Sequence, residues 1–497
     1  MIEMTKQNLP EPVSVFRWFY ELNQIPRGSG NEKAASDWLL SVAKGMNLEA
    51  HQDKANNIII RKAASKGYEN APAVILQGHM DMVCEKVAES THDFEKDPIR
   101  MLIDGDTLRS DGTTLGGDDG LAVAYALALL EDDKLVHPAL EVLITTSEET
   151  GMDGAMAIHD AIKNGEKPLS GKLLLNIDSE EEGIFLIGCA GGANFQVALA
   201  AKREKTAPQA GLTLKVHGLQ GGHSGQKIIE GRGNAIKLLA RLLNKARCAS
   251  CLDSACTVNE LRLGCFEGGS KHNAIPLLAF SCFSVKDVAR ARKALESEIA
   301  AIKREYSVID PGLHIELGEC TLEESYNPEV SASLIDYIFC SPNGVQSMSH
   351  DIPGLVQTSL NVAVLENTPE GFNLTSSIRS SLASSSQEVL DRLTRLANRC
   401  GLVASSSGSY PAWEIKEHSP LREKALEVWK DMTGREGEIE AIHAGVECGL
   451  FSEVMPDVDM LSMGPDLADV HTPNEHLSIP SVGRCYEFIK KLLAELK

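Results

Sequence analysis

The sequence predicts an α/β protein with a mostly parallel sheet, interrupted by an inserted α+β domain. Two observations support this fold class. Residues 10–190 alternate short apolar segments with segments of helical periodicity, which is typical of a parallel sheet covered on both faces. Residues 191–405 contain segments in which apolar and polar residues alternate, which is typical of strands with one wet face.

In the first part of the chain, apolar runs bounded by polar turns predict strands, and segments with apolar residues three and four apart predict helices. The predicted strands lie within residues 56–63, 71–83, 140–149 and 172–180. The predicted helices lie within residues 13–25, 32–48, 120–133 and 154–165.

The middle of the chain changes character. Residues 211–219 place Leu212, Leu214 and Val216 on one face and polar residues on the other, which predicts a half-buried strand. Helical patterns follow within residues 233–246, 285–306 and 385–401, and again, nearer the end of the chain, within 421–434 and 481–497. A Ser-rich stretch at residues 404–410 indicates a domain boundary.

The composition indicates a large globular protein and limits its partners. The 497 residues suffice for two or three domains, and the hydrophobic fraction of 43% suffices for large cores. The 70 acidic and 48 basic residues give a net charge of -22, which argues against nucleic acid or an anionic membrane as the main partner. We find neither a leader pattern nor a run near the roughly 18 apolar residues of a membrane span, so a cytoplasmic location is expected.

The 12 cysteines are scattered, which predicts buried thiols in a reducing compartment. Cys248 and Cys251 form a C-x-x-C motif with Cys256 nearby, but the motif lacks the second matching pair of a typical zinc site. A metal or redox role is therefore not favoured there.

Chemically active side chains follow several predicted strands at the point where each strand ends. His79 and Asp81 follow one strand, Glu148 and Glu149 a second, and Asp178 a third. The carboxyl ends of parallel strands meet at one edge of a sheet, so these side chains are expected to converge. So many anions in one crevice would raise each other's pKa values unless a strong positive charge lay between them.

Two further segments complete a candidate metal site. Asp118 and Asp119 lie in a Gly-rich loop ahead of a predicted helix, and His471 lies in a loop near the end of the chain. Two divalent cations would be neutralised by one bridging carboxylate, two terminal carboxylates and a hydroxide, with two neutral imidazoles completing the ligands. The residues that match this count are His79, Asp118, Glu149, Asp178 and His471. An N/O ligand set without thiolate suits zinc, with manganese or cobalt as substitutes.

The motifs "GHMDMV", "LGGDDGLA", "TTSEETG", "NIDSE" and "DVHTPNEHL" resemble the metal-site motifs of the co-catalytic zinc peptidases that include glutamate carboxypeptidase, tripeptidase and acetylornithine deacetylase. The resemblance extends over nearly the whole chain. It implies a dizinc-peptidase catalytic domain in two segments, residues 1–190 and 406–497, with an inserted lid domain at residues 191–405.

The resemblance also implies a role for each site residue. One zinc would be held by His79, Asp118 and Asp178, and the other by Asp118, Glu149 and His471. Asp81 would orient the imidazole of His79, and Glu148 would be the general base on a water between the metals. The peptide bond after Asp118 would be cis.

In the lid domain, the resemblance implies that His223, Asn273 and Arg379 stabilise the oxyanion and hold the substrate carboxylate. An arginine suits the latter role because its guanidinium can pair with both carboxylate oxygens. The resemblance leaves open whether two copies pair as a homodimer or whether the long lid replaces that pairing.

The resemblance implies hydrolysis of small peptides, specifically dipeptides with a free N-terminus, including Xaa-His substrates. Two alternatives stay open: a tripeptidase or N-acyl amino-acid deacylase with the same dimetal centre, and a catalytically inactive relative that acts as a binding protein. Each site residue also has an ordinary structural explanation by itself, such as a helix cap for Asp118. Only the combination is specific.

Overall fold

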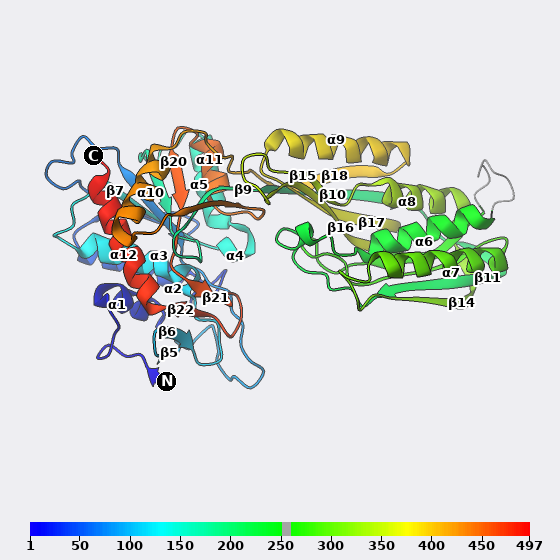
Figure 1. Ribbon diagram of the computed structural model, residues 1–497, viewed down its shortest axis with the longest axis horizontal. Helices are drawn as coiled ribbons and strands as arrows, with labels where there is room; N and C mark the ends of the chain where they lie inside the picture. The colour runs from blue at the N-terminus through cyan, green and yellow to red at the C-terminus, as the bar shows by residue number, and fades with distance from the viewer. Residues whose placement is uncertain (251–259) are drawn as a thin grey trace. The chain divides into compact units, whose positions relative to one another are not determined.

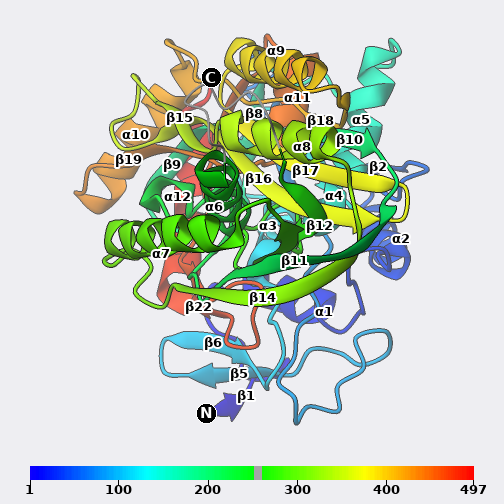
Figure 2. The same ribbon diagram turned by 90° about the vertical axis from the view of Figure 1, so that its right-hand side faces the viewer.

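The computed structural model describes residues 1–250 and 260–497, which divide into two compact units (Figures 1 and 2). Unit 1 comprises Met1–Gly188, Trp413–Ala441 and Val446–Lys497, and therefore holds both ends of the chain. Unit 2 comprises Cys189–Ala412 and Ile442–Gly445. The chain thus passes from unit 1 into unit 2 and back, as expected for an inserted domain.

The main sheet of unit 1 carries parallel strands at its centre. Its strand order is β19 (Glu438–Ile442), β9 (Ile184–Cys189), β20 (Asp459–Ser462), β8 (Leu173–Asn176), β4 (Val74–His79), β7 (Leu140–Thr145), β3 (Ile58–Lys62) and β2 (Glu49–Gln52). Strands β20, β8, β4 and β7 are mutually parallel, whereas β9, β3 and β2 pair antiparallel with their neighbours. The expected parallel sheet is therefore its central part, and the whole sheet is mixed.

The helices of unit 1 are α1 (Val13–Leu22), α2 (Lys33–Gly45), α3 (Gly117–Glu131), α4 (Glu148–Gly151), α5 (Asp153–Lys163), α10 (Pro420–Thr433), α11 (Cys448–Val454) and α12 (Ile479–Glu495). They follow the predicted segments except for two short ones, α4 and α11, which were not predicted. Helix α3 is apolar all round and buried from Gly120 to Leu130, as expected of a helix that crosses a core. Helix α10 begins with Ser419 as N-cap and Pro420 at its first position and ends at Gly434, whose φ is 70°, so its sequence determines both ends. Helices α10 and α12 lie side by side (Figure 1).

A smaller sheet of unit 1 joins the start of the chain to its last segment. Its strand order is β1 (Ile2–Glu3), β5 (Met101–Asp104), β6 (Thr107–Ser110), β22 (His476–Ser478) and β21 (Leu467–Ala468). The pairing of β6 with β22 fastens the segment that follows His471 beside the segment that precedes Asp118. Residues some 350 positions apart are thereby brought to one place.

Unit 2 is built on one antiparallel sheet. Its strand order is β14 (His314–Ser325), β11 (Glu204–His217), β13 (Ala279–Ser284), β12 (Arg262–Gly268), β16 (Val356–Thr368), β17 (Gly371–Ser380), β10 (Gly191–Ala200) and β18 (Val403–Tyr410), with β15 (Gly344–Met348) paired to β16. In β11 the predicted alternation is confirmed, since Leu212, Leu214 and Val216 are fully buried and Thr213 and Lys215 are half-buried. The Ser-rich stretch forms strand β18 paired with β10, and not a linker.

The helices of unit 2 are α6 (Ala235–Ser250), α7 (Val288–Glu305), α8 (Pro328–Cys340) and α9 (Ala383–Arg399), with a short 3₁₀ turn at Ile228–Glu230. Helices α6 and α7 pack against each other, and β11 lies beside β14 (Figure 2). Buried leucines of α6, such as Leu239 and Leu243, meet the apolar face of β11 in one core.

The prediction that the cysteines are buried is wrong for Cys84, Cys248 and Cys340, which are exposed. Cys84 follows the end of β4 in an irregular segment, where a small side chain need not enter a core. Cys251 and Cys256 lie outside the described residues. Every helix within residues 1–250 and 260–497 falls short of the length or the apolarity that a bilayer span requires.

Candidate metal centre

His79 stands at the carboxyl end of β4, a strand in which every residue is buried. Its Nε2 atom lies 3.2 Å from Oδ1 of Asp118 and 3.5 Å from Oδ1 of Asp178. Asp178 follows β8, the parallel neighbour of β4, by two residues. The predicted meeting of strand ends is therefore present for these two side chains, and the first turn of α3 supplies Asp118.

Asp118 lies between two imidazoles. Its Oδ1 atom faces His79, and its Oδ2 atom lies 2.9 Å from Nε2 of His471. The same Nε2 atom of His471 lies 3.0 Å from Oε2 of Glu149. The ligand atoms of His79, Asp118 and Asp178 lie within 4.8 Å of one another, as do those of Asp118, Glu149 and His471. Asp118 is common to both sets, which is the arrangement expected of a bridging carboxylate.

The peptide bond between Asp118 and Asp119 is cis, as the resemblance implies. The two adjacent carboxylates serve different partners. Asp119 is buried, and its oxygens accept from the backbone N–H groups of His79 (3.1 Å) and Ala122 (3.3 Å). Asp119 therefore fixes the end of β4 against the start of α3 and leaves the two imidazoles to Asp118.

Asp81 has no exposed side-chain surface and joins the end of β4 to α4. Its Oδ1 atom lies 3.3 Å from Nδ1 of His79 and accepts from the backbone N–H of Glu148 at 3.1 Å. Its Oδ2 atom accepts from Oγ of Ser29 at 2.8 Å. Burial opposes ionisation, but His79, Ser29 and the N–H of Glu148 lower the pKa of Asp81 below its usual range. A carboxylate so placed orients the imidazole and the start of α4 together.

Glu148 and Glu149 form the first turn of α4, after Ser147 in a left-handed conformation with φ 52°. Glu149 directs Oε2 to His471, while its Oε1 atom is buried without a hydrogen-bond partner. Glu148 groups with His79 and Glu149, their ligand atoms again within 4.8 Å of one another. Burial raises the pKa of Glu148 well above its usual value, and the charges of Asp178 and Glu447 add to this effect.

The residues present fit a pair of metal ions. Burial, together with the carboxylates of Asp118 and Glu149, raises the pKa of Asp178 to about 6, although His79 acts in the opposite direction. Asp118 and Glu149 in turn raise the pKa of His471 to about 11. Cations held between these groups would relieve the crowding of anions and would give the orphaned Oε1 atom of Glu149 a partner. The donors are carboxylate oxygens and imidazole nitrogens, which is a ligand set for zinc or a similar divalent ion.

Sequence reasoning missed two buried charged residues that hold this site. Glu475 accepts from the backbone N–H groups of Leu115 (2.7 Å), Gly116 (3.1 Å) and Gly117 (2.7 Å), so it ties the loop before Asp118 to the segment after His471. Arg27 donates to the carbonyls of Met80, Asp81 and Gly116, and so ties that loop to the end of β4. The quoted motif "DVHTPNEHL" contains Glu475, but its partners are backbone atoms far away in the sequence.

Glu475→Ala is expected to lower the free energy of unfolding of the metal-free protein by about 2–4 kcal/mol, because three buried N–H groups lose their acceptor. Urea unfolding followed by circular dichroism measures this. Glu487→Ala on the exposed side of α12 is the control and should change stability by less than about 0.5 kcal/mol. Equal stabilities of the two variants would contradict the assigned role of Glu475.

Within unit 2, the three predicted substrate-binding residues lie close together. The Nη2 atom of Arg379, on β17, lies 3.4 Å from Nε2 of His223. The carbonyl of Asn273 accepts from the N–H of Ser224 at 2.8 Å, which places Asn273 beside His223. Burial, followed by the charge of Arg379, lowers the pKa of His223 below its usual value, which favours the neutral form of its imidazole.

Two further members of this unit 2 cluster were missed. Tyr410 accepts through its hydroxyl from Nη1 of Arg379 at 3.0 Å, and Nε2 of His443 lies 2.7 Å from Oγ of Ser359. Burial, with the charge of Arg379, lowers the pKa of His443 to about 3. His443 lies in the segment Ile442–Gly445, which belongs to unit 2 although the residues on both sides of it belong to unit 1. Only tertiary contacts decide the unit to which so short a segment belongs.

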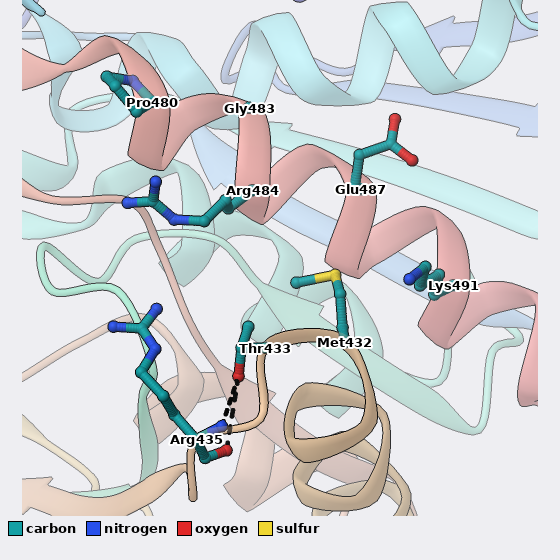
Figure 3. A pocket seen from close by; sticks show the side chains of 8 residues that line it. All are labelled: Met432, Thr433, Arg435, Pro480, Gly483, Arg484, Glu487 and Lys491. Carbon is teal, nitrogen blue, oxygen red and sulfur yellow. Dashed lines mark hydrogen bonds between the residues drawn. The ribbon is translucent and has the colours of Figure 1, made fainter.

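A separate pocket of about 870 Å³ lies on unit 1 between the end of α10 and α12 (Figure 3). Arg435 and Arg484 line it, and both donate to the buried carboxylate of Glu182 at 2.7 Å. Their charges are therefore already paired. None of the predicted site residues lines this pocket. The candidate active site therefore remains the group of metal-ligand candidates, His79, Asp118, Glu149, Asp178 and His471.

Comparisons with known proteins show the family of this chain. The family model for peptidase family M20/M25/M40 matches residues 75–495. The chain belongs to this peptidase family. It is therefore an enzyme of the peptidase class, as the five motifs predict. The matched range includes all five candidate metal ligands, from His79 to His471.

Three of the proteins that this chain resembles match it over almost its whole length. The cytosol non-specific dipeptidase of Escherichia coli (strain K12) is 37% identical over 503 aligned residues, which cover 99% of each chain. The solved structure of aminoacylhistidine dipeptidase from Vibrio alginolyticus is 33% identical with a TM-score of 0.87, covering 99% of this chain and 98% of that chain. Aminopeptidase PepT from Bacillus cereus, at 15% identity and a TM-score of 0.55, covers 98% of this chain and 100% of that chain and shares the fold alone.

Proposed function

We propose that this M20/M25/M40 family member is a two-zinc dipeptidase that hydrolyses dipeptides with a free N-terminus, including Xaa-His dipeptides. The observation that carries the proposal is the position of Asp118, which faces His79 with one oxygen and His471 with the other. The names of the full-length relatives from Escherichia coli and Vibrio alginolyticus support dipeptides as substrates, and the former name supports a cytosolic location.

In the proposed mechanism, His79, Asp118 and Asp178 would hold one cation, and Asp118, Glu149 and His471 would hold the other. When bound, the cations would supply Lewis acidity to polarise the attacking water and the scissile carbonyl. Glu148 accepts the proton of that water on its carboxylate and later donates it to the leaving amine. Asp81 keeps the imidazole of His79 in place and, through the N–H of Glu148, the base as well.

The two adjacent glutamates have different proposed roles: Glu149 binds metal, and Glu148 transfers the proton. Glu149 faces His471, whereas Glu148 has no ion-pair partner among the described residues and keeps a free carboxylate. In unit 2, Arg379 would hold the substrate carboxylate, and His223 with Asn273 would stabilise the oxyanion. Whether copies pair as a homodimer is a separate prediction, which sedimentation of the purified protein tests.

The proposal is tested with metal-free protein reloaded with zinc, manganese or cobalt and assayed on a substrate panel. The panel contains Xaa-His and other dipeptides, a tripeptide and an N-acetylated amino acid. We expect hydrolysis of unblocked dipeptides to exceed that of the other two classes. Preference for the tripeptide or the N-acetylated substrate would instead support the alternative activities, and turnover of none would support a binding protein.

Arg379→Lys is expected to lower kcat/KM for dipeptides by about 10–100-fold, chiefly through KM, because lysine cannot form the paired hydrogen bonds of a guanidinium. Steady-state kinetics on one dipeptide measure the effect. Arg392→Lys, at an exposed position on α9, is the matched control and should leave both constants unchanged. An unchanged KM in Arg379→Lys would remove the carboxylate-binding role.

A further inference from the structure

A row of polar side chains crosses the main sheet of unit 1 just behind the strand ends that carry the candidate ligands. Gln77 on β4, Asn176 on β8 and Ser462 on β20 are directly opposed in register. Gln77 precedes His79 by two residues, and Asn176 precedes Asp178 by two. Side chains two apart in a strand point to the same face, so Gln77 shares its face with His79.

Hydrogen bonds join this row end to end. Nδ2 of Asn176 donates to Oε1 of Gln77 at 2.6 Å, and Oγ of Ser462 donates to Oδ1 of Asn176 at 2.5 Å. At the other end, Nε2 of Gln77 donates to Oε2 of Glu447 at 2.5 Å. The same Oε2 atom accepts from Oγ1 of Thr145 on β7 at 2.7 Å.

The whole row is inaccessible to water. Gln77, Asn176, Thr145, Ser462 and Glu447 are each at most 1% exposed. Glu447 is the N-cap residue of α11, and its side chain reaches back to the strands instead of capping its own helix. Burying a carboxylate costs free energy, and the side chain of Glu447 does not cap α11 in return. We therefore expect its role to lie at the strand ends that it contacts.

We propose that Glu447 is a positioning residue for the metal centre, acting through Gln77, Thr145 and Asn176 on the strand ends that carry His79, Glu148 and Asp178. This inference rests on the proposed function, because it presupposes metal binding at those residues. Glu447 does not belong to any of the candidate ligand sets. Glu447 accepts hydrogen bonds from Gln77 on β4 and Thr145 on β7, and Gln77 in turn accepts from Asn176 on β8. Glu447 therefore holds the three strand ends in fixed relative positions, as precise metal coordination requires.

The test measures zinc affinity by chelator competition on metal-free protein. Glu447→Leu removes the acceptor and is expected to weaken binding at the position that includes His79 and Asp178 by about 10–100-fold. Glu447→Gln keeps a carbonyl oxygen for both donors and is expected to change affinity by less than about threefold. If Glu447→Leu does not fold, Gln77→Met, which breaks the row at its centre, serves instead with the same expected loss.

Glu141 offers a matched control, since it is a buried carboxylate at the opposite end of β7 that accepts from Ser170 and Gly171. Glu141→Leu should lower thermal stability and leave zinc affinity unchanged. Wild-type affinity in Glu447→Leu, or an equal loss of affinity in Glu141→Leu, would overturn the positioning role. Failure of the wild-type protein to bind zinc would instead overturn the proposed function itself.

Discussion

Glu148→Gln is expected to lower kcat for dipeptide hydrolysis by about 10²–10⁴-fold while the protein retains its bound metal. Glutamine has almost the same shape as glutamate but cannot accept and return a proton. Glu148 belongs to no ion pair among the described residues, whereas Oε2 of Glu149 lies 3.0 Å from Nε2 of His471. The measurements are steady-state turnover of a dipeptide and the metal content by elemental analysis.

The variant Glu149→Gln is compared with Glu148→Gln, because Glu149 is a candidate metal ligand and Glu148 is the proposed base. Glu149→Gln should lose metal at the position shared with His471, and excess zinc should restore part of its activity. Excess zinc should leave Glu148→Gln inactive. Glu166→Gln, at an exposed position after α5, controls for charge removal alone. Wild-type turnover in Glu148→Gln would remove the proposed base.

Asp118→Asn is expected to weaken zinc binding at both positions, because this carboxylate faces both imidazoles. The loss of affinity should exceed about 100-fold, since replacing a direct metal ligand should cost more affinity than replacing a residue that only hydrogen-bonds to a ligand. Asparagine presents one neutral oxygen in place of two charged ones. Activity should fall to background together with the metal. Zinc titration of the metal-free variant measures the loss.

Asp178→Asn separates a shared ligand from a ligand of one position. Asp178 lies 3.5 Å from His79 and belongs to one candidate ligand set only. Its substitution should therefore weaken one binding event and leave the other intact. If Asp118→Asn also weakened only one event, Asp118 would not bridge the two positions.

The fold was predictable where the pattern is local. The apolar runs that became β4, β7 and β8 and the apolar face of β11 are recognisable from spacing alone, because each strand buries its own residues. The Ser-rich strand β18 was not predictable in this way. It has few apolar residues of its own and is held as a strand by its backbone pairing with β10.

The residues of the candidate site were also predictable only in part. His79, Asp118, Glu149, Asp178 and His471 carry chemistry in their side chains, and their motifs predicted that they belong together. Glu475, Arg27 and Glu447 were missed or left without a role because their partners are backbone atoms or side chains on distant strands. A residue type in a sequence does not reveal such partners.

The sequence by itself determined many of the strands and helices of the core, the inventory of candidate ligands and the family, because periodicity and functional groups are properties of short segments. Only the tertiary structure decided that Asp118 faces both imidazoles, that His443 joins unit 2, and that Glu447 supports the strand ends. The physical reason is that these facts depend on the register of β4, β7 and β8 and on the pairing of β6 with β22, which join segments far apart in the chain.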